Sequence, residues 1–478
     1  MAQRRVLIRH ATLVSMDREV GTVDDVDVLV EDGIIADIGH GISDAGGESI
    51  DAAGGILAPG FIDTHRHTWQ TQLRALCGDW VLGDYLAGVR YTLSPAYEPD
   101  DVYLGNYAGG LEALDAGVTT ILDFSHCNNT PDHADAAVRG LRDARIRAVF
   151  GYGFFDSSPA SPPHFLSHDM RVADFHRVAD DLQADRASLV SLGAALTEYG
   201  VVPIEATAQE IRAARSRGAL VVTHTGCVWS MPSGVSEFAE HGLLDPHQVH
   251  VHCNTLDEAE WRALAAHGAK ISISPETELN MGMGRPVFAQ ARQHGLKPTL
   301  SADVVSLNSG DLFHQLRLAI AFDRWASTEH VNLAGEDPLA PTVSAYEALE
   351  WVTVNAAEAL GMEDRIGSVT VGKRADLMIV GGHGRSAHPR IDPAATLVFQ
   401  TTPADVETVL VDGTVVKHDG RLLEVDETVL DERLDASAAR ILERVKTAGA
   451  TLPGTPPGGM FAAIRAMAEA ASGSHAPA

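Results

Sequence analysis

The chain has 478 residues, 45% of them hydrophobic and 21% charged, and a formal net charge of −29. This acidic balance argues against nucleic acid and anionic membranes as partners, because both bind clustered Lys and Arg side chains. No apolar run approaches the ~18 residues of a membrane span, and the N-terminus lacks the apolar core of a signal peptide, so we expect a cytoplasmic protein.

The N-terminal segment contains short β-like runs at residues 6–8, 26–30 and 34–38, separated by turn residues. Similar runs return late in the chain, at 376–380 and 408–416. Neither set offers enough strands for a stable domain of its own. We therefore predict that both ends of the chain form one small composite β-sandwich domain, from residues 1–57 and 361–425.

Between these two parts, apolar runs of strand length alternate with segments of helical periodicity, such as 206–217 and 257–267. Repeated β/α units predict an α/β protein with a (β/α)8 TIM-type barrel, here over residues 58–360 with a closing helix over 345–360. Residues 426–478 are predicted to form a C-terminal helical extension. It would pack either on its own barrel or on another subunit.

Polar residues close several of the predicted barrel strands. The run Gly-Phe-Ile-Asp-Thr-His-Arg-His ends in His65 and His67, and three other runs end in His224, His252 and Asp303. Residues i and i+2 of a strand share a face, so both imidazoles of the first pair can reach one ion. Because strand C-termini of such a barrel converge on one pocket, we predict that all five side chains meet there.

These residues lie within a longer series of motifs. The series comprises residues 60–67, Gly-Val-Thr-Thr at 117–120 with Asp123, His224, His252, Ser-Pro at 274–275, Asp303, and 367–377. In this series the chain resembles the amidohydrolase superfamily, specifically the branch of cytosine and guanine deaminases and chlorohydrolase-like triazine hydrolases. The resemblance covers nearly the whole chain and implies the same barrel and composite β domain.

Three imidazoles and one carboxylate, from His65, His67, His224 and Asp303, suit a divalent metal ion and leave a position for water. We expect Zn²⁺, with Fe²⁺ as the alternative, and Asp303 as general base. The resemblance implies that His252 polarises the substrate or orients the nucleophile.

Many relatives hold two metals through a modified lysine near the fourth strand. Every lysine of this chain lies at position 270 or later, so we expect one metal ion per chain. Glu198 could replace that lysine as a bridging ligand, but we interpret it as a surface residue.

Deaminases of this branch carry a proton-shuttling glutamate three residues after the histidine that corresponds to His224. Here that residue is Cys227, and a thiol is a poor substitute for a carboxylate. One solution is that Glu276, on the loop after the seventh strand together with Glu278, supplies the acid. The other is that Asp303 passes its proton directly to the leaving group, and the sequence leaves both open.

Substrate contacts are predicted from the residues that follow the strand ends. Trp69, Gln72 and Trp229 would give the pocket rim aromatic and amide groups suited to a planar heterocycle or aryl amide, although Trp69 could equally pack under its loop. His126 would either line the pocket or cap a loop. Asn308 would bind substrate or help to cap the helix that begins near Asp311.

These observations predict a metal-dependent hydrolase of non-peptide C–N bonds in a small N-heterocycle or a cyclic or aryl amide. One alternative is an aminohydrolase that uses Glu276 as its proton shuttle. Another is a metal-binding lyase, isomerase or binding protein without hydrolytic activity. The expected partner is a small-molecule substrate, and the resemblance favours a homo-oligomer.

Overall fold

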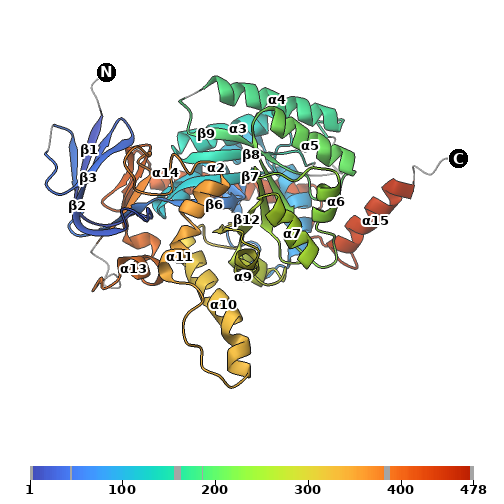
Figure 1. Cartoon of the computed structure of the whole chain (residues 1–478). Coiled ribbons are helices and arrows are strands. Elements are labelled where there is room, and N and C mark those ends of the chain that lie inside the picture. The colour runs from blue at the N-terminus through green and yellow to red at the C-terminus, as the bar shows by residue number, and fades with distance from the viewer. Residues whose placement is uncertain (1–3, 44–45, 156–162, 186, 382–387, 474–478) are drawn as a thin grey trace.

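The computed structural model describes residues 4–43, 46–155, 163–185, 187–381 and 388–473. Eight parallel strands follow one another in chain order across the central sheet. They are β6 (Phe61–Arg66), β7 (Val118–Ser125), β8 (Arg147–Gly153), β9 (Val190–Ala195), β10 (Leu220–Thr225), β11 (Gln248–His252), β12 (Lys270–Ile273) and β13 (Pro298–Leu300). The predicted (β/α)8 barrel is confirmed, with helices around the strands (Figure 1).

The first and last strands are joined near their C-terminal ends. The backbone N–H of Asp303 donates to the carbonyl of His65 (3.0 Å), and the N–H of His67 donates to the carbonyl of Asp303 (3.1 Å). Deeper in the barrel, the Thr64 hydroxyl lies 2.7 Å from that of Thr299. The closure therefore places Asp303 directly beside His65 at the end of β6 and His67 just after it.

The helices vary widely in length. They are α1 (Leu82–Tyr85), α2 (Pro99–Asp115), α3 (Pro131–Asp143), α4 (His168–Ala184), α5 (Ile204–Ser216), α6 (Val235–Glu240), α7 (Glu258–Ala266), α8 (Pro275–Asn280), α9 (Phe288–Gln293), α10 (Leu312–Leu333), α11 (Ala345–Glu350), α12 (Val354–Ala359), α13 (Pro393–Phe399), α14 (Glu427–Thr447) and α15 (Met460–Gly473). Short segments of 3-10 helix are η1 (Thr68–Leu73), η3 (Ser94–Ala96) and η5 (Pro403–Asp405), and η2 (Leu86–Leu93) is a π-helix. Within the described parts of the chain, none of the helices is both long and apolar enough to cross a bilayer.

The predicted closing helix over 345–360 is wrong as a single element. The segment is divided into α11 and α12, because backbone carbonyls between the two helices accept hydrogen bonds from barrel strands. The Trp351 carbonyl accepts from Leu300 N–H (3.2 Å) and the Val352 carbonyl accepts from Ile62 N–H (2.8 Å). A continuous helix would use these carbonyls internally, so the break lets this segment satisfy strands β6 and β13 at the barrel's lower end.

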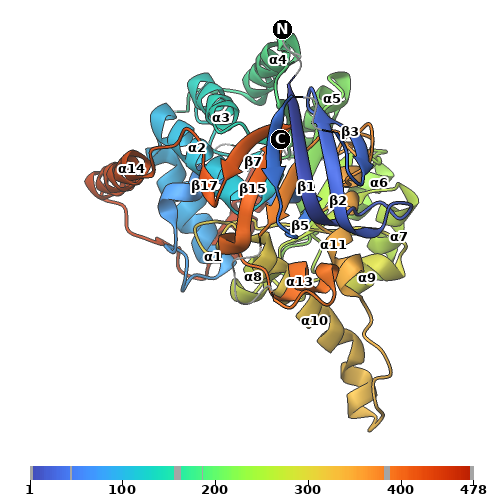
Figure 2. The same ribbon diagram turned by 90° about the vertical axis from the view of Figure 1, so that its left-hand side faces the viewer.

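The two ends of the chain combine in one nine-stranded sheet, as predicted (Figure 2). Its strands are β1 (Arg5–Val14), β2 (Thr22–Glu31), β3 (Ile34–Gly39), β4 (Glu48–Asp51), β5 (Ile56–Pro59), β14 (Leu377–Val380), β15 (Val406–Val411), β16 (Thr414–His418) and β17 (Arg421–Leu422). The two halves meet where β14 pairs with β5 in antiparallel register. Leu57 and Leu377 are both fully buried in the core of this domain.

A buried ion pair connects this sheet to the barrel. Arg147, the first residue of β8, donates two hydrogen bonds to Asp376, at 2.6 and 2.9 Å, and one to Asp412 at 3.1 Å. Arg147 and Asp376 are only 2% and 3% exposed. Bidentate geometry of this kind fixes the orientation of the two units as well as contributing energy.

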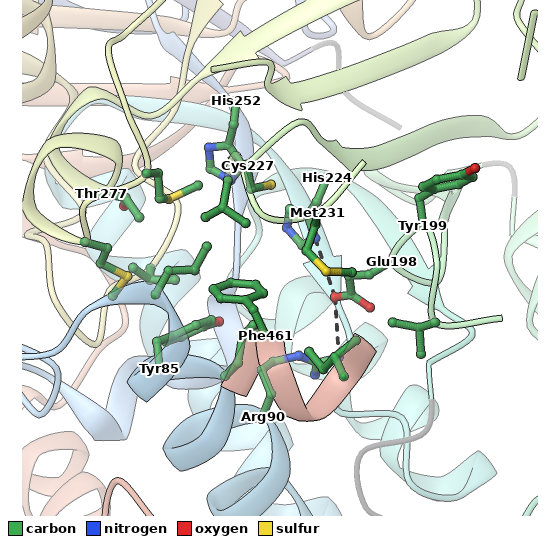
Figure 3. Close-up of a pocket in the computed structure, with 18 of the residues that line it drawn as sticks. Tyr85, Arg90, Glu198, Tyr199, His224, Cys227, Met231, His252, Thr277 and Phe461 are labelled. Atoms are coloured by element: carbon green, nitrogen blue, oxygen red, sulfur yellow. Dashed lines mark ion pairs between the residues drawn. The ribbon is translucent and has the colours of Figure 1, made fainter. Parts of the chain in front are cut away.

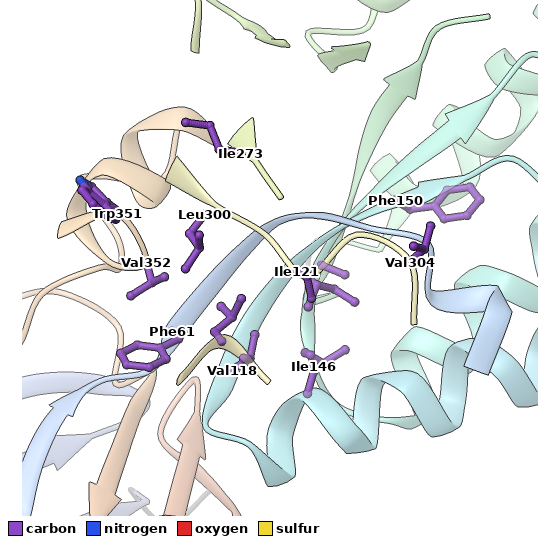
Figure 4. Packing of buried hydrophobic residues seen from close by; sticks show 14 of the residues in the cluster. Phe61, Val118, Ile121, Ile146, Phe150, Ile273, Leu300, Val304, Trp351 and Val352 are labelled. Carbon is purple, nitrogen blue, oxygen red and sulfur yellow. The ribbon is translucent and has the colours of Figure 1, made fainter. Parts of the chain in front are cut away.

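The barrel core is continuous with the packing around its helices. Figure 4 shows Phe61 and Val118 from the first two strands near Trp351 and Val352 of the segment between α11 and α12. Trp351 also stacks on Phe288, with ring centroids 4.3 Å apart. The barrel strands are therefore held in place by a closely packed core.

Both C-terminal helices contact their own barrel. On α14, Arg444 donates to the buried Asp101 of α2 (2.8 Å), and Ser437 donates to the same carboxylate at 2.6 Å. On α15, Arg465 donates to the carbonyl of Ser230 (3.0 Å). These hydrogen bonds join both helices of the extension to their own barrel, which was one of the two predicted arrangements.

Candidate active site

Five side chains from strand ends converge at the C-terminal face of the barrel: His65, His67, His224, His252 and Asp303. We call them the strand-end cluster. Asp303 Oδ1 lies 3.1 Å from His65 Nε2 and 3.3 Å from His67 Nε2. His224 Nε2 lies 3.3 Å from His65 Nε2. The ligand atoms of two overlapping groups, His65 with His224 and His252 and His65 with His67 and Asp303, lie within 4.8 Å of one another.

This geometry fits a metal ion. Ligands that share a tetrahedral zinc ion at Zn–N distances of ~2.0–2.1 Å lie about 3.3 Å apart. The Nδ1–H of His67 donates to the carbonyl of Phe124 (3.0 Å), which orients the ring so that its Nε2 faces the cluster. Such hydrogen bonds select the tautomer and orientation of metal-ligating histidines.

The backbone at the cluster adopts conformations that ordinary residues rarely take. Asp303 has φ of +58°, His252 of +76° and Cys253 of +59°. Non-glycine residues in the left-handed region gather at functional sites, where the surrounding structure holds them in place. For Asp303, the two backbone hydrogen bonds to β6 hold this conformation.

Burial shapes the titration of these groups. Burial alone would raise the pKa of the Asp303 carboxyl, but hydrogen bonds with His65 and His67 hold that pKa well below its usual range. Burial lowers the pKa of His65 well below its usual value and that of His224 to about 4. The imidazoles of His65 and His224 are therefore neutral and the Asp303 carboxylate is charged, which are the protonation states that metal binding requires.

A cavity of about 110 Å³ opens above the cluster (Figure 3). One water needs roughly 10–15 Å³, so the cavity holds roughly seven to eleven atoms of that size, about as many as a small heterocycle has. Its walls are largely apolar and include Tyr91, Phe155, Met231, Met283 and Phe461. The polar residues that line it are four members of the cluster, His67, His224, His252 and Asp303, together with Tyr85, Arg90, His126, Glu198, Tyr199, Cys227 and Thr277.

His252 is held by Glu278, which sequence reasoning had set aside in favour of Glu276. His252 Nδ1 lies 3.1 Å from Glu278 Oε1, which also accepts from the backbone N–H of Ser274 (2.9 Å). Burial alone would lower the pKa of His252, but the hydrogen bond to Glu278 raises it. Glu278 is fully buried, so it acts on His252 from behind the cavity.

The predicted loop that carries both glutamates is instead the short helix α8. Residues two apart on a helix point in nearly opposite directions, since each residue turns the chain by ~100°. Glu276 accordingly lies away from the cavity lining, where its carboxylate accepts from Gln315 Nε2 (2.6 Å) and sits 3.6 Å from His314. Glu278 points toward the barrel.

Glu198 is not the surface residue that we inferred from the sequence. Its side chain lines the cavity, and Oε1 lies 3.6 Å from His224 Nδ1. It therefore stands behind His224 much as Glu278 stands behind His252. Cys227 also lines the cavity, and burial raises the pKa of its thiol, which keeps it protonated.

Of the predicted substrate contacts His126, Trp69 and Trp229, only His126 lines the cavity. His126 lines the cavity, stacked on His67 with ring centroids 4.1 Å apart. Trp69 is buried beneath it and donates its indole N–H to His126 Nδ1 (3.0 Å). Trp229 is 79% exposed and outside the cavity lining.

Gln72 and Asn308 are also engaged elsewhere. Gln72 donates to the carbonyl of Asp101 (2.6 Å) and to Ser437. Asn308 donates to Thr277 Oγ1 (2.6 Å) and to the carbonyl of Ala302 (2.9 Å). Their amides thus support the cavity from outside, and Asp311 is the N-cap of α10.

We define the side wall of the cavity as η2 with Arg90, the segment after β9 with Glu198, and the start of α15 with Phe461. The sequence analysis considered Glu198 only as a metal ligand or a surface residue, and it missed Arg90 and Phe461. Arg90 belongs to a π-helical turn, an uncommon feature that often marks functional sites. A buried arginine within an apolar run was the available signal, since such residues are rarely buried without a partner.

Comparisons with known proteins agree with this architecture. The sequence profile of the amidohydrolase family matches residues 56–416. A 5-methylthioadenosine/S-adenosylhomocysteine deaminase of Symbiobacterium thermophilum is 29% identical over 92% of this chain and 99% of its own. A 5'-deoxyadenosine deaminase of Methanothermobacter thermautotrophicus is 26% identical over 87% of this chain and 94% of its own.

Two solved structures share the fold. An adenosine deaminase from Xanthomonas campestris with bound zinc superposes with a TM-score of 0.79 at 22% identity, covering 92% of this chain and 98% of its own. A mutant atrazine chlorohydrolase from Arthrobacter aurescens, complexed with zinc and atraton, gives 0.78 at 22% identity, covering 91% and 100%. With the family profile spanning barrel and strand-end cluster alike, the chain belongs to the amidohydrolase family.

Proposed function

We propose that this amidohydrolase uses one divalent metal ion, with zinc favoured over iron, to hydrolyse a non-peptide C–N bond of a small N-heterocycle. The observation that carries the proposal is the approach of Asp303 Oδ1 to two imidazole nitrogens at the bottom of the cavity, within 3.3 Å of each. His65, His67, His224 and Asp303 would hold the ion. When bound, it would lower the pKa of a coordinated water from ~16 to about 7.

The chain's own residues would then move the proton and orient the substrate. Asp303, kept ionised by its histidine neighbours, accepts the proton of the attacking water. His252 Nε2 lies 3.9 Å from Asp303 Oδ2, and Glu278 fixes the orientation of the His252 ring. From this position His252 would contact a polar group attached to the carbon that the water attacks. His126 completes the polar surface opposite.

Release of an exocyclic amino group is the first reaction to test, because the curated relatives described above are named as deaminases. Glu276 is absent from this proposal, since its carboxylate is bound to Gln315 outside the cavity. Asp303 therefore passes the proton on to the leaving group, whether this is ammonia or a ring or aryl amide nitrogen. The cytoplasmic location and homo-oligomeric state stay predictions.

The test is hydrolysis in ¹⁸O-labelled water with metal-loaded enzyme and a panel of amino-substituted N-heterocycles and cyclic or aryl amides. We expect one ¹⁸O per product, with ammonium released from the amino substrates. His252→Asn should lower turnover, whereas His250→Asn, on the same strand but bonded to Thr225, is the matched control. An unlabelled product would show a lyase or isomerase, and turnover that survives complete metal removal would exclude the metal mechanism.

A further inference from the structure

Arg90 and Glu198 face each other in the side wall of the cavity (Figure 3). Arg90 Nη2 lies 3.9 Å from Glu198 Oε1, too far for a hydrogen bond. The guanidinium is 1% exposed and is fixed on two sides. Its Nη1 donates to the carbonyl of His126 (2.8 Å), and its plane lies over the Phe155 ring, 4.6 Å from the centroid.

Both residues keep one buried polar atom unsatisfied. Arg90 Nη2 and Glu198 Oε2 have no hydrogen-bond partner among the described residues. Buried polar atoms of charged groups are seldom left in this state, because their desolvation is not compensated. Since both line the cavity, a ligand would supply the missing partners.

The charge of the pair limits what that ligand is. A carboxylate would be attracted by Arg90 but repelled by Glu198. A cation would be attracted by Glu198 but repelled by Arg90. A neutral group with a hydrogen-bond acceptor next to a donor satisfies both atoms at once. The apolar and aromatic walls, including Tyr91 and Phe461, favour a flat ring around it.

We propose that Arg90 and Glu198 form a recognition subsite for a lactam edge of an N-heterocyclic substrate. Arg90 Nη2 donates to the ring carbonyl and Glu198 Oε2 accepts from the adjacent ring N–H. This inference rests on the proposed function, because it takes the substrate to be a heterocycle whose C–N bond is cleaved at the strand-end cluster. The preferred substrates then carry a lactam as well as the bond that is hydrolysed.

The experiment measures binding rather than turnover. Calorimetric titration of the metal-loaded enzyme would use 4(3H)-pyrimidinone, which has a lactam edge, pyrimidine, which lacks it, and pyrimidine-4-carboxylate, an anion. We expect the wild type to bind the pyrimidinone at least tenfold more tightly than the other two. Arg90→Met and Glu198→Gln should each remove that preference and leave the weak binding of pyrimidine within twofold.

The chain offers a matched control in Arg171. It is also buried, donates to a backbone carbonyl, that of Asn128 (3.1 Å), and lies over an aromatic ring, that of Phe165, but it is outside the cavity lining. Arg171→Met should keep the wild-type preference. Metal content and thermal unfolding, measured for every variant, separate loss of the subsite from loss of the ion near His224 or of the fold, and Glu198→Gln alone still tests the proposal if Arg90→Met does not fold.

Equal or tighter binding of the carboxylate, no binding of the pyrimidinone, or an unchanged preference in both variants would overturn the subsite. The outcome is distinct from that of the hydrolysis test. Lactam binding without turnover of any amino-substituted lactam would leave the subsite standing and contradict the proposed function. Hydrolysis of amino-substituted lactams at wild-type rates by Arg90→Met would contradict the subsite and leave the proposed function standing.

Discussion

The strand-end cluster and the side wall line the same cavity, yet they are built in different ways. All five cluster residues lie within three residues of the C-terminal end of a strand, in a closed sheet whose backbone fixes their positions. The side wall comes from a π-helical turn, a segment beyond β9 and the C-terminal helix α15. The rigid cluster is therefore suited to a reaction that stays the same among related enzymes. The side wall can change its substrate preference without disturbing the cluster.

The largest expected effect is in the cluster. Asp303→Asn keeps the shape of the side chain but removes the charge that accepts the proton from water. We predict a loss of ~10²–10⁴ in kcat, the usual contribution of a general base. Steady-state kinetics with the best substrate from the panel would measure it, and a loss below tenfold would exclude Asp303 as the base.

The next effect concerns the support of the side wall. Glu210 of α5 accepts from the N–H (3.0 Å) and hydroxyl (2.7 Å) of Thr197, next to Glu198, and burial raises its pKa to about 8 from an ordinary 4.5. A carboxyl with a raised pKa binds more protons in the folded state, so the free energy of unfolding decreases between about pH 4.5 and pH 8.

Glu210→Gln should remove that decrease. The variant should be more stable than the wild type at pH 8, by on the order of 4 kcal/mol, and similar to it near pH 4.5. Urea unfolding at the two pH values measures the difference. Parallel pH profiles for the two proteins would show that Glu210 is ionised in the folded state.

Glu278→Gln tests how much the orientation of the His252 ring contributes to catalysis, because Glu278 holds that ring but does not line the cavity. Glutamine keeps the volume but weakens the hydrogen bond that holds His252. Partners of this kind contribute ~10–100-fold to activity or metal affinity. We predict a loss in kcat of that size with KM nearly unchanged, and Glu276→Gln, on the outer face of α8, is the control that should leave kinetics near wild type.

The smallest effect should come from α15. Phe461→Ala removes apolar contact from the side wall without touching the cluster. About 1 kcal/mol of uniform binding energy would be lost, which raises KM roughly fivefold and leaves kcat within twofold. Val429→Ala, an exposed position on α14, is the control, and a large loss of kcat in Phe461→Ala would place α15 in the chemistry.

This contrast also explains what the sequence could predict. His65, His67, His224, His252 and Asp303 were recognisable because the end of an apolar run places a side chain at the C-terminal face of any such barrel. The composite sheet was recognisable because neither set of terminal strands is sufficient alone.

The side wall has no such local signal. Phe461 reaches the cavity from a helix that follows the entire β domain, and only tertiary packing brings it there. The choice between Glu276 and Glu278 depended on whether their segment is a loop or a helix, and the short run gave no clear periodicity. The break between α11 and α12 depended on hydrogen bonds to distant strands.

Metal content is the most direct test of the central claim that the strand-end cluster holds one catalytic ion. Plasma mass spectrometry on the wild type, Asp303→Ala and the control His250→Asn should give near one equivalent of zinc or iron in the first and third and much less in the second. Two equivalents would require a second site, with Glu198 as the first candidate ligand. No bound metal in the wild type, even after adding zinc back, would contradict the account.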